Sequence, residues 1–225
     1  MRLRMLAIGV LLIGFVLISR TASADSVAVQ NASFEQIGSG GLPDGCGTGC
    51  AYGYGPVPGW TGTGGGQWQL GATGTYFNQA APDGSTVAFI NGTLSQDLDV
   101  TLLANTQYTL TVDVGDRLDG FNGGWSIALD GGAQQLCTNG GQTSSIPAGT
   151  FADESCTFTT GSVAPSGDLF VVLGGSGLGD DTTFDNVRVS APEPESIVLL
   201  GAGLFCVAVF GVLYKRNQSL AGIAS

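Results

Sequence analysis

Short runs of alternating apolar and polar residues, separated by glycine-rich turns, restrict the fold of this chain more than any other feature. In the run 108–114, apolar residues take every second position, from Tyr108 to Val114. This period of two is that of a β-strand with one buried face and not that of a helix. The chain has 38 glycines, and several stand in turn sequences such as 122–124 and 130–132. Many short strands with frequent turns predict an all-β fold, an antiparallel β-sandwich of the jelly-roll type.

The two ends of the chain are apolar and differ from the middle. Residues 1–24 have a basic start, an apolar stretch and small residues before the cleavage point, which is the order of a secretory signal peptide. An uncharged apolar run at 197–214 is long enough for a transmembrane helix. Lys215 and Arg216 follow it, which predicts that the tail 217–225 stays cytoplasmic. The sequence therefore predicts an exported protein of the cell surface or extracellular matrix, with a folded domain over 25–190.

Charge and composition exclude several functions. The formal net charge is −11, with 18 acidic residues against 7 basic ones, and the chain has no histidine. Nucleic acid is not an expected partner, because almost nothing in the domain would neutralise phosphates. The lack of histidine excludes a Ser-His-Asp triad and a histidine general base, and no motif marks a pair of acids. The sequence therefore predicts a protein that is not an enzyme. An uncharacterised carbohydrate-active enzyme with two catalytic carboxylates is the alternative.

Four cysteines lie in the predicted domain, an even number that suits an oxidising compartment. They are Cys46, Cys50, Cys137 and Cys156, and four cysteines allow three connectivities. The pairing of Cys46 with Cys50 and of Cys137 with Cys156 is favoured. The first bond would close a small glycine-containing loop, and the second would tie two neighbouring strands. The spacings do not suggest a four-cysteine zinc site.

A short motif precedes the C-terminal apolar run. It is Pro192-Glu193-Pro194, and the apolar run and the Lys215-Arg216 pair follow it in that order. This order resembles the PEP-CTERM sorting signal of bacteria that make exopolysaccharide, over residues 191–216. The resemblance implies a membrane-embedded processing enzyme, exosortase, as a partner. An ordinary C-terminal anchor with a proline-containing stalk is the alternative reading.

Five short segments of the domain together resemble the galactose-binding-like jelly rolls, which include many carbohydrate-binding modules. They are 31–35, 57–60, 94–98, 108–110 and 184–189. The resemblance implies a structural calcium ion, whose ligands in that family correspond here to Glu35 and Asp185. Asp185 shares strand parity with Val187 and Val189, so its carboxylate is expected on the core face, where a cation would offset the cost of burial. Pairing with Arg188 or with backbone N–H groups is the alternative.

Aromatic residues of the domain are candidates for stacking on sugar rings. The ligand-binding candidates are Tyr52, Tyr54, Trp68 and Tyr76. Packing in the core is the alternative for each of them, and Trp60 and Tyr108 are assigned to the core. The predicted function is a non-catalytic component of the cell surface or polysaccharide matrix that binds glycans. A structural or adhesive envelope protein without a sugar site is the second hypothesis.

Overall fold

The computed structural model describes residues 24–192, apart from residue 48 and the segments 121–122 and 177–181, and four single positions at 203, 205, 206 and 209. The chain divides into two units, one of which is Asp25–Ala191 and holds nearly all the described residues. The strands are β1 (Ala24–Val27), β2 (Asp44–Gly45), β3 (Ala51–Tyr54), β4 (Thr61–Gln69), β5 (Thr86–Thr101), β6 (Gln107–Gly115), β7 (Gly124–Gly131), β8 (Gln134–Gln142), β9 (Phe151–Thr159), β10 (Asp168–Ser176) and β11 (Thr182–Pro192). One 3-10 turn, Thr143–Ser145, joins β8 to β9. The predicted all-β class is confirmed.

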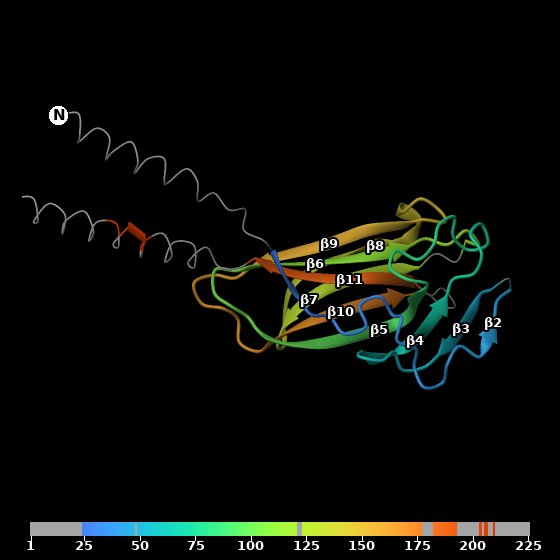
Figure 1. Cartoon of the computed structure of the whole chain (residues 1–225), viewed down its shortest axis with the longest axis horizontal. Helices are drawn as coiled ribbons and strands as arrows, with labels where there is room; N and C mark the ends of the chain where they lie inside the picture. Colours follow the sequence, from blue (N-terminus) through green and yellow to red (C-terminus); the bar gives the residue numbers. More distant parts are fainter. Residues whose placement is uncertain are drawn as a thin grey trace, which may run out of the picture. The chain divides into compact units, whose positions relative to one another are not determined.

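The strands form one branched antiparallel sheet in which β5 is shared (Figure 1). One branch has the order β2-β3-β4-β5-β10-β7-β8, and the other consists of β1, β11, β6 and β9. The second half of β5 pairs with β10 from residue 92 to residue 101, whereas residues 88–90 pair with β11. Because β5 changes partner along its length, it connects the two branches at one end of the unit.

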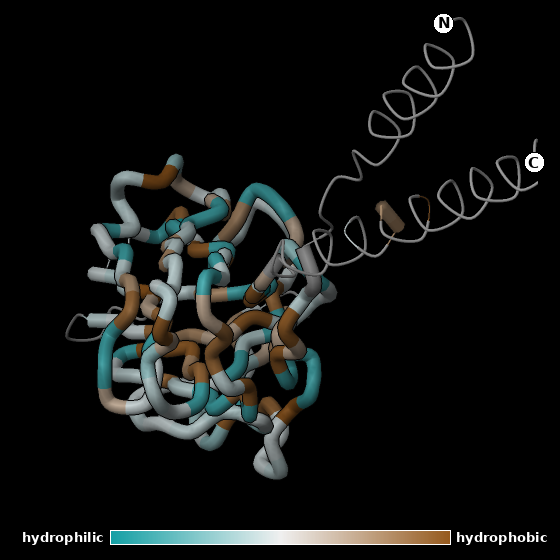
Figure 2. Tube along the Cα trace, turned by 90° about the vertical axis from the view of Figure 1, so that its left-hand side faces the viewer, coloured by the Kyte–Doolittle hydropathy of each residue, from teal (hydrophilic) through white to brown (hydrophobic). Residues whose placement is uncertain are grey.

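The main hydrophobic core combines side chains from both branches. On β6 the alternating set predicted from the sequence, Tyr108 to Val114, is buried in this core, and Trp60 is buried there as well. The other branch supplies Leu169, Val171 and Leu173 of β10 together with Ile127 and Leu129 of β7. Figure 2 shows hydrophobic segments gathered within this unit and hydrophilic loops at its margins. Burial of these side chains is the main force that holds the fold together.

A β-bulge in β11 decides which way Asp185 points. Asp185 pairs with Asp113 and Arg188 pairs with Thr111, so β11 has one residue more than β6 over this interval. Asn186, inside the bulge, has a φ of 50°. Such a bulge reverses the alternation of side chains along its strand. Asp185 therefore shares the face of Asp113, opposite the main core, and the prediction that it lies on the core face with Val187 and Val189 is wrong.

Both disulfides form in the pairing favoured from the sequence. Cys46 and Cys50 close a loop between β2 and β3, with their Cα atoms 5.1 Å apart. Cys137 of β8 and Cys156 of β9 have Cα atoms 5.8 Å apart. Because β8 pairs with β7 and β9 pairs with β6, the second bond joins the two branches and not two strands that pair with each other.

The predicted terminal segments lie largely outside the described residues. This applies to the signal peptide 1–24 except Ala24, to the tail 217–225, and to the sorting-motif residues Glu193, Pro194, Lys215 and Arg216; Pro192 is the last residue of β11. Within the apolar run 197–214, four single positions are described as helical. In the described part of the chain, no helix reaches the length and hydropathy needed to span a membrane.

Candidate functional site

A second apolar cluster lies on the face of the sheet opposite the main core. One row of paired residues runs from Tyr52 of β3 through Trp68 of β4 to Val87 of β5. The next row runs from Phe89 of β5 through Thr183 and Gly115 to Phe151 of β9. Residues paired across antiparallel strands place their side chains on one face. We call these two rows the aromatic face.

The connection between β4 and β5, residues 70–85, covers the aromatic face. Its Phe77 ring stacks on Phe151 with centroids 4.4 Å apart, and the rings of Tyr76 and Phe77 lie 5.1 and 5.9 Å from Trp68. Phe77 and Trp68 are buried. The backbone N–H of Leu118 donates to the carbonyl of Tyr76 at 2.9 Å. The covering segment is thus held by ring contacts and a few hydrogen bonds, without strand pairing of its own.

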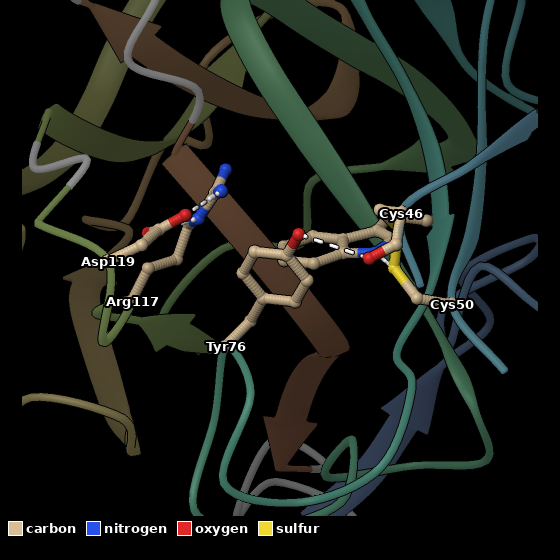
Figure 3. The surroundings of a disulfide bond; sticks show 6 residues. Cys46, Cys50, Tyr76, Arg117 and Asp119 are labelled. Carbon is tan, nitrogen blue, oxygen red and sulfur yellow. Dashed lines mark hydrogen bonds and ion pairs between the residues drawn. A yellow bond between two sulfur atoms is a disulfide. The ribbon is translucent and has the colours of Figure 1, made fainter. Parts of the chain in front are cut away.

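An arginine and a disulfide fix two rings at the margin of this cluster. The Arg117 guanidinium carbon lies 4.9 Å from the ring centroid of Trp68 and 5.3 Å from that of Tyr76. Figure 3 shows the Tyr76 ring between Arg117 and the Cys46–Cys50 bond. Trp68 Nε1 donates to Cys50 Sγ at 2.9 Å, and the Tyr76 hydroxyl donates to the Cys46 carbonyl at 3.3 Å. A cation over ring faces adds electrostatic attraction to the packing.

The four aromatic residues predicted to bind sugar all lie in this cluster, but they do not form a row of exposed rings. Only Tyr54 is largely exposed, at 69 %, and it packs edge-on against Phe89 with centroids 5.0 Å apart. Tyr52 also contacts Phe89, at 6.3 Å, whereas Trp68 is buried under Tyr76. Sequence reasoning missed Phe89, Phe151 and Thr183. Their positions depend on strand register, for which the sequence carries no local signal.

A fully buried carboxyl group lies on the same face. The Asp185 side chain has no exposed surface; its Oδ2 accepts from the backbone N–H of Asp83 at 2.9 Å and its Oδ1 from that of Asn186 at 2.7 Å. Burial raises the pKa of Asp185 to about 8 against the lowering effect of both hydrogen bonds, and the charges of Asp113 and Asp83 raise it further. At neutral pH the group therefore keeps its proton and can act as an acid.

Three aspartates form one row across β11, β6 and β9, namely Asp185, Asp113 and Asp153. Arg188 pairs with Asp153 and lies 3.6 Å from Asp113, to which the Asn186 amide also donates at 2.9 Å. Burial is the main cause that raises the pKa of Asp113 too, against the lowering effect of the Asn186 hydrogen bond. With one arginine for three acids, the row keeps negative charge near Asp185 and favours its protonated form.

The two predicted calcium ligands hold one turn between them. Glu35 Oε1 accepts from the backbone N–H groups of Ser85 and Thr86 at 2.7 and 2.6 Å, while Asp185 binds the N–H of Asp83. A calcium ion needs oxygen ligands, whereas these carboxyl oxygens face N–H donors. Among the residues described, no three His, Cys, Asp or Glu side chains are grouped as metal ligands would be. The arrangement does not fit calcium, so the ion stays a sequence-based prediction and no step below uses it.

A hollow of about 440 Å³ lies elsewhere on the unit. It is lined by Gly92, Thr93, Gly124, Trp125, Ser126, Gly141, Gln142, Gly174, Gly175 and Ser176. None of these side chains is an acid or a base, so the hollow offers no group that transfers protons. The aromatic face combines apolar rings with an acid, and we take it as the functional site.

Comparison with known proteins gives a consistent set of similarities. The family model HpiC1-like, described as HpiC1 cyclase, matches residues 25–190. A cyclase from Fischerella sp. TAU, solved in complex with 4-(1H-indol-3-yl)butan-2-one, is 28% identical with a TM-score of 0.62 over 76% of this chain and 100% of that one. A Stig cyclase from Fischerella sp. TAU, in complex with (3Z)-3-(1-methyl-2-pyrrolidinylidene)-3H-indole, is 25% identical with a TM-score of 0.59 over the same shares. No curated protein sequence matches.

These similarities correct three predictions made from the sequence. The identification as a PEP-CTERM protein with a galactose-binding-like domain is wrong, because residues 25–190 match a cyclase family instead. The predicted role as a non-catalytic, glycan-binding surface or matrix protein is wrong for the same reason, since the matched structures are cyclases with bound indole compounds. The prediction that the protein is not an enzyme fails as well. The lack of histidine excluded histidine chemistry, but a buried aspartic acid can also transfer protons.

Proposed function

The chain belongs to the HpiC1-like cyclase family, and from this premise we propose that it closes a ring in a substrate that carries an indole or a similar aromatic nucleus. The observation that carries the proposal is Asp185, a fully buried acid with a pKa of about 8 on the same sheet face as a cluster of aromatic rings. The indole compounds bound by the two Fischerella cyclases support the substrate class. We also propose that the fold is a jelly-roll sandwich, with which the strand order is compatible.

The aromatic face binds the flat nucleus of the substrate in this proposal. Trp68, Phe89 and Phe151 offer ring faces and edges, and aromatic pairs gain free energy beyond the burial of area. In the structure described, Tyr76 and Phe77 of the covering segment occupy this space. Substrate enters when residues 70–85 move, and its nucleus replaces the ring contacts that these two side chains make. Closure of the segment then excludes water from the site.

Asp185 supplies the proton that starts the ring closure. It donates the proton to an unsaturated carbon of the substrate side chain, so that a C–H bond forms from the π electrons and a carbocation remains. The π electrons of the aromatic nucleus then form the new C–C bond, and the nucleus loses a proton to the Asp185 carboxylate. Substrate and product are isomers, and the acid is restored. The surrounding rings stabilise the cation through their faces. The backbone N–H groups of Asp83 and Asn186 stabilise the Asp185 carboxylate.

Export of the protein remains part of the proposal. The two disulfides support it, because such bonds persist in oxidising compartments outside the cytosol. The enzyme would then act in the cell envelope or outside the cell, on an apolar substrate that reaches this compartment.

The proposal is tested by product analysis with a variant of the acid. Purified protein is incubated with indoles that carry an unsaturated side chain, and isomers of unchanged mass are sought by chromatography and mass spectrometry. Asp185→Asn should abolish turnover, at least a hundredfold as expected for a lost general acid, yet still bind 4-(1H-indol-3-yl)butan-2-one. Asp44→Asn, the same substitution at an exposed carboxylate, is the control. Unchanged turnover in Asp185→Asn, or a wild-type protein that neither binds nor converts any indole, would refute the proposal.

A further inference from the structure

Thr183 places a buried hydroxyl group in the aromatic face, and this hydroxyl makes no hydrogen bond to the described residues. The residue has no exposed surface. A buried hydroxyl without a partner destabilises a fold, and most buried polar groups in proteins are hydrogen-bonded. Two other buried threonines follow that rule. Thr182 donates to the Gly124 carbonyl at 3.0 Å, and Thr160 donates to the Leu103 carbonyl at 2.6 Å.

Aromatic side chains surround this hydroxyl. Thr183 pairs with Phe89 on one side and with Gly115 on the other, and Phe151 follows in the same row. A Cβ atom at Gly115 would lie 2.7 Å from Phe151 and 2.9 Å from Phe77, so both rings lean over the glycine next to Thr183. Phenylalanine rings offer no conventional hydrogen-bond partner. The hydroxyl is thus the single polar feature of this row, set in an apolar environment.

We propose that the Thr183 hydroxyl orients the substrate by accepting a hydrogen bond from the N–H of its aromatic nucleus. This inference rests on the proposed function and specifies its substrate class: a nucleus with a free ring N–H, not an N-alkylated one. Thr183 and Asp185 are two residues apart on one strand face, a distance of about 7 Å. A nucleus held at Thr183 therefore places its side chain toward Asp185. Thr183 is a positioning residue, and Asp185 carries the chemistry.

Binding of two ligands to three proteins tests the inference. The ligands are 4-(1H-indol-3-yl)butan-2-one and its N-methyl analogue, titrated by calorimetry against the wild type, Thr183→Val and Thr160→Val. One hydrogen bond predicts about a fivefold preference of the wild type for the free N–H compound. Thr183→Val keeps the shape of the side chain and should bind both compounds alike. Thr183→Ala removes the same hydroxyl with less volume and gives the same comparison if the valine variant does not fold.

The melting temperature supplies the matched control. Thr183→Val should not lower it, because the hydroxyl that it removes has no hydrogen-bond partner in the part of the chain that the structure describes. Thr160→Val should lower it, because the Thr160 hydroxyl donates to Leu103 and accepts from the Thr106 N–H at 2.8 Å. A Thr183 variant that keeps the preference for the N–H compound would overturn this inference and leave the proposed function standing. A wild-type protein that binds neither compound would overturn both.

Discussion

Burial of Asp185 makes the stability of the fold depend on pH in a direction that follows from its pKa. The pKa of Asp185 is 3.8 in the unfolded chain and about 8 in the folded protein. Below pH 3.8 both states hold the proton and the group has no effect. Between the two values the unfolded chain loses the proton while the folded protein keeps it, so the free energy of unfolding falls as pH rises. At 1.36 kcal/mol per pH unit the loss is complete above pH 8 and amounts to about 6 kcal/mol.

Asp185→Asn removes this ionisation and should remove the pH dependence that it causes. Asparagine has one side-chain oxygen, so the N–H of Asp83 or of Asn186 loses its acceptor, at a cost of about 1–3 kcal/mol at every pH. The variant should therefore be less stable than the wild type at pH 4 and more stable at pH 9. Burial also raises the pKa values of Asp113 and Asp130. Both residues remain in the variant, so their contributions to the pH dependence largely cancel when the two proteins are compared.

The assay is urea unfolding followed by tryptophan fluorescence at intervals from pH 4 to pH 9. Asp44→Asn serves as the control, because it makes the same substitution at an exposed position and should follow the wild-type curve. The reasoning predicts that the curves of the wild type and Asp185→Asn cross. Parallel curves over this range would show that Asp185 is ionised in the folded protein, and the assignment of an acid to this site would fail.

Three further predictions concern the parts of the fold that support the site. Replacing Cys137 and Cys156 by serine should lower the free energy of unfolding by about 3 kcal/mol, measured by urea titration, because the bond joins the two branches. Gly115→Ala should cost about 1–3 kcal/mol and change the near-ultraviolet circular dichroism of the aromatic face, whereas Gly40→Ala, with open space around it, should not. A chelator should leave the melting temperature unchanged, because the Asp185 oxygens already accept N–H bonds; a fall that Asp185→Asn abolishes would instead support calcium binding.

The strands were predictable from the sequence because alternation is a local signal. Tyr108 to Val114 showed it directly, and the same residues form the buried face of β6. The direction of Asp185 was not predictable in this way. β11 has one extra residue here, with Asn186 in a left-handed conformation, and the side chains before the bulge therefore point to the face opposite the one that strict alternation predicts. A bulge depends on pairing with β6, about seventy residues earlier, and the sequence near Asp185 does not reveal that partner.

The site was harder to predict than the fold for a related reason. Tyr52, Trp68 and Tyr76 were selected as ligand-binding residues because aromatic side chains are dense in that part of the sequence, and they do lie in one cluster. Their role was assigned to sugar because aromatic rings stack on sugar rings and because short segments of the domain resemble carbohydrate-binding modules. Asp185 and Thr183 reach the cluster only through the pairing of β11 with β5 and β6. The prediction that the protein is not an enzyme was wrong for this reason. The proton donor is distant in sequence from the aromatic residues, and only the strand pairing brings them together.

The position of a bound indole tests the account most directly. A crystal structure of the protein with 4-(1H-indol-3-yl)butan-2-one should show the ring system against Trp68 and Phe89 under a displaced segment 70–85. Its N–H should face Thr183 and its side chain should face Asp185. An indole found in the glycine-lined hollow at Trp125, with the aromatic face still closed, would contradict the account.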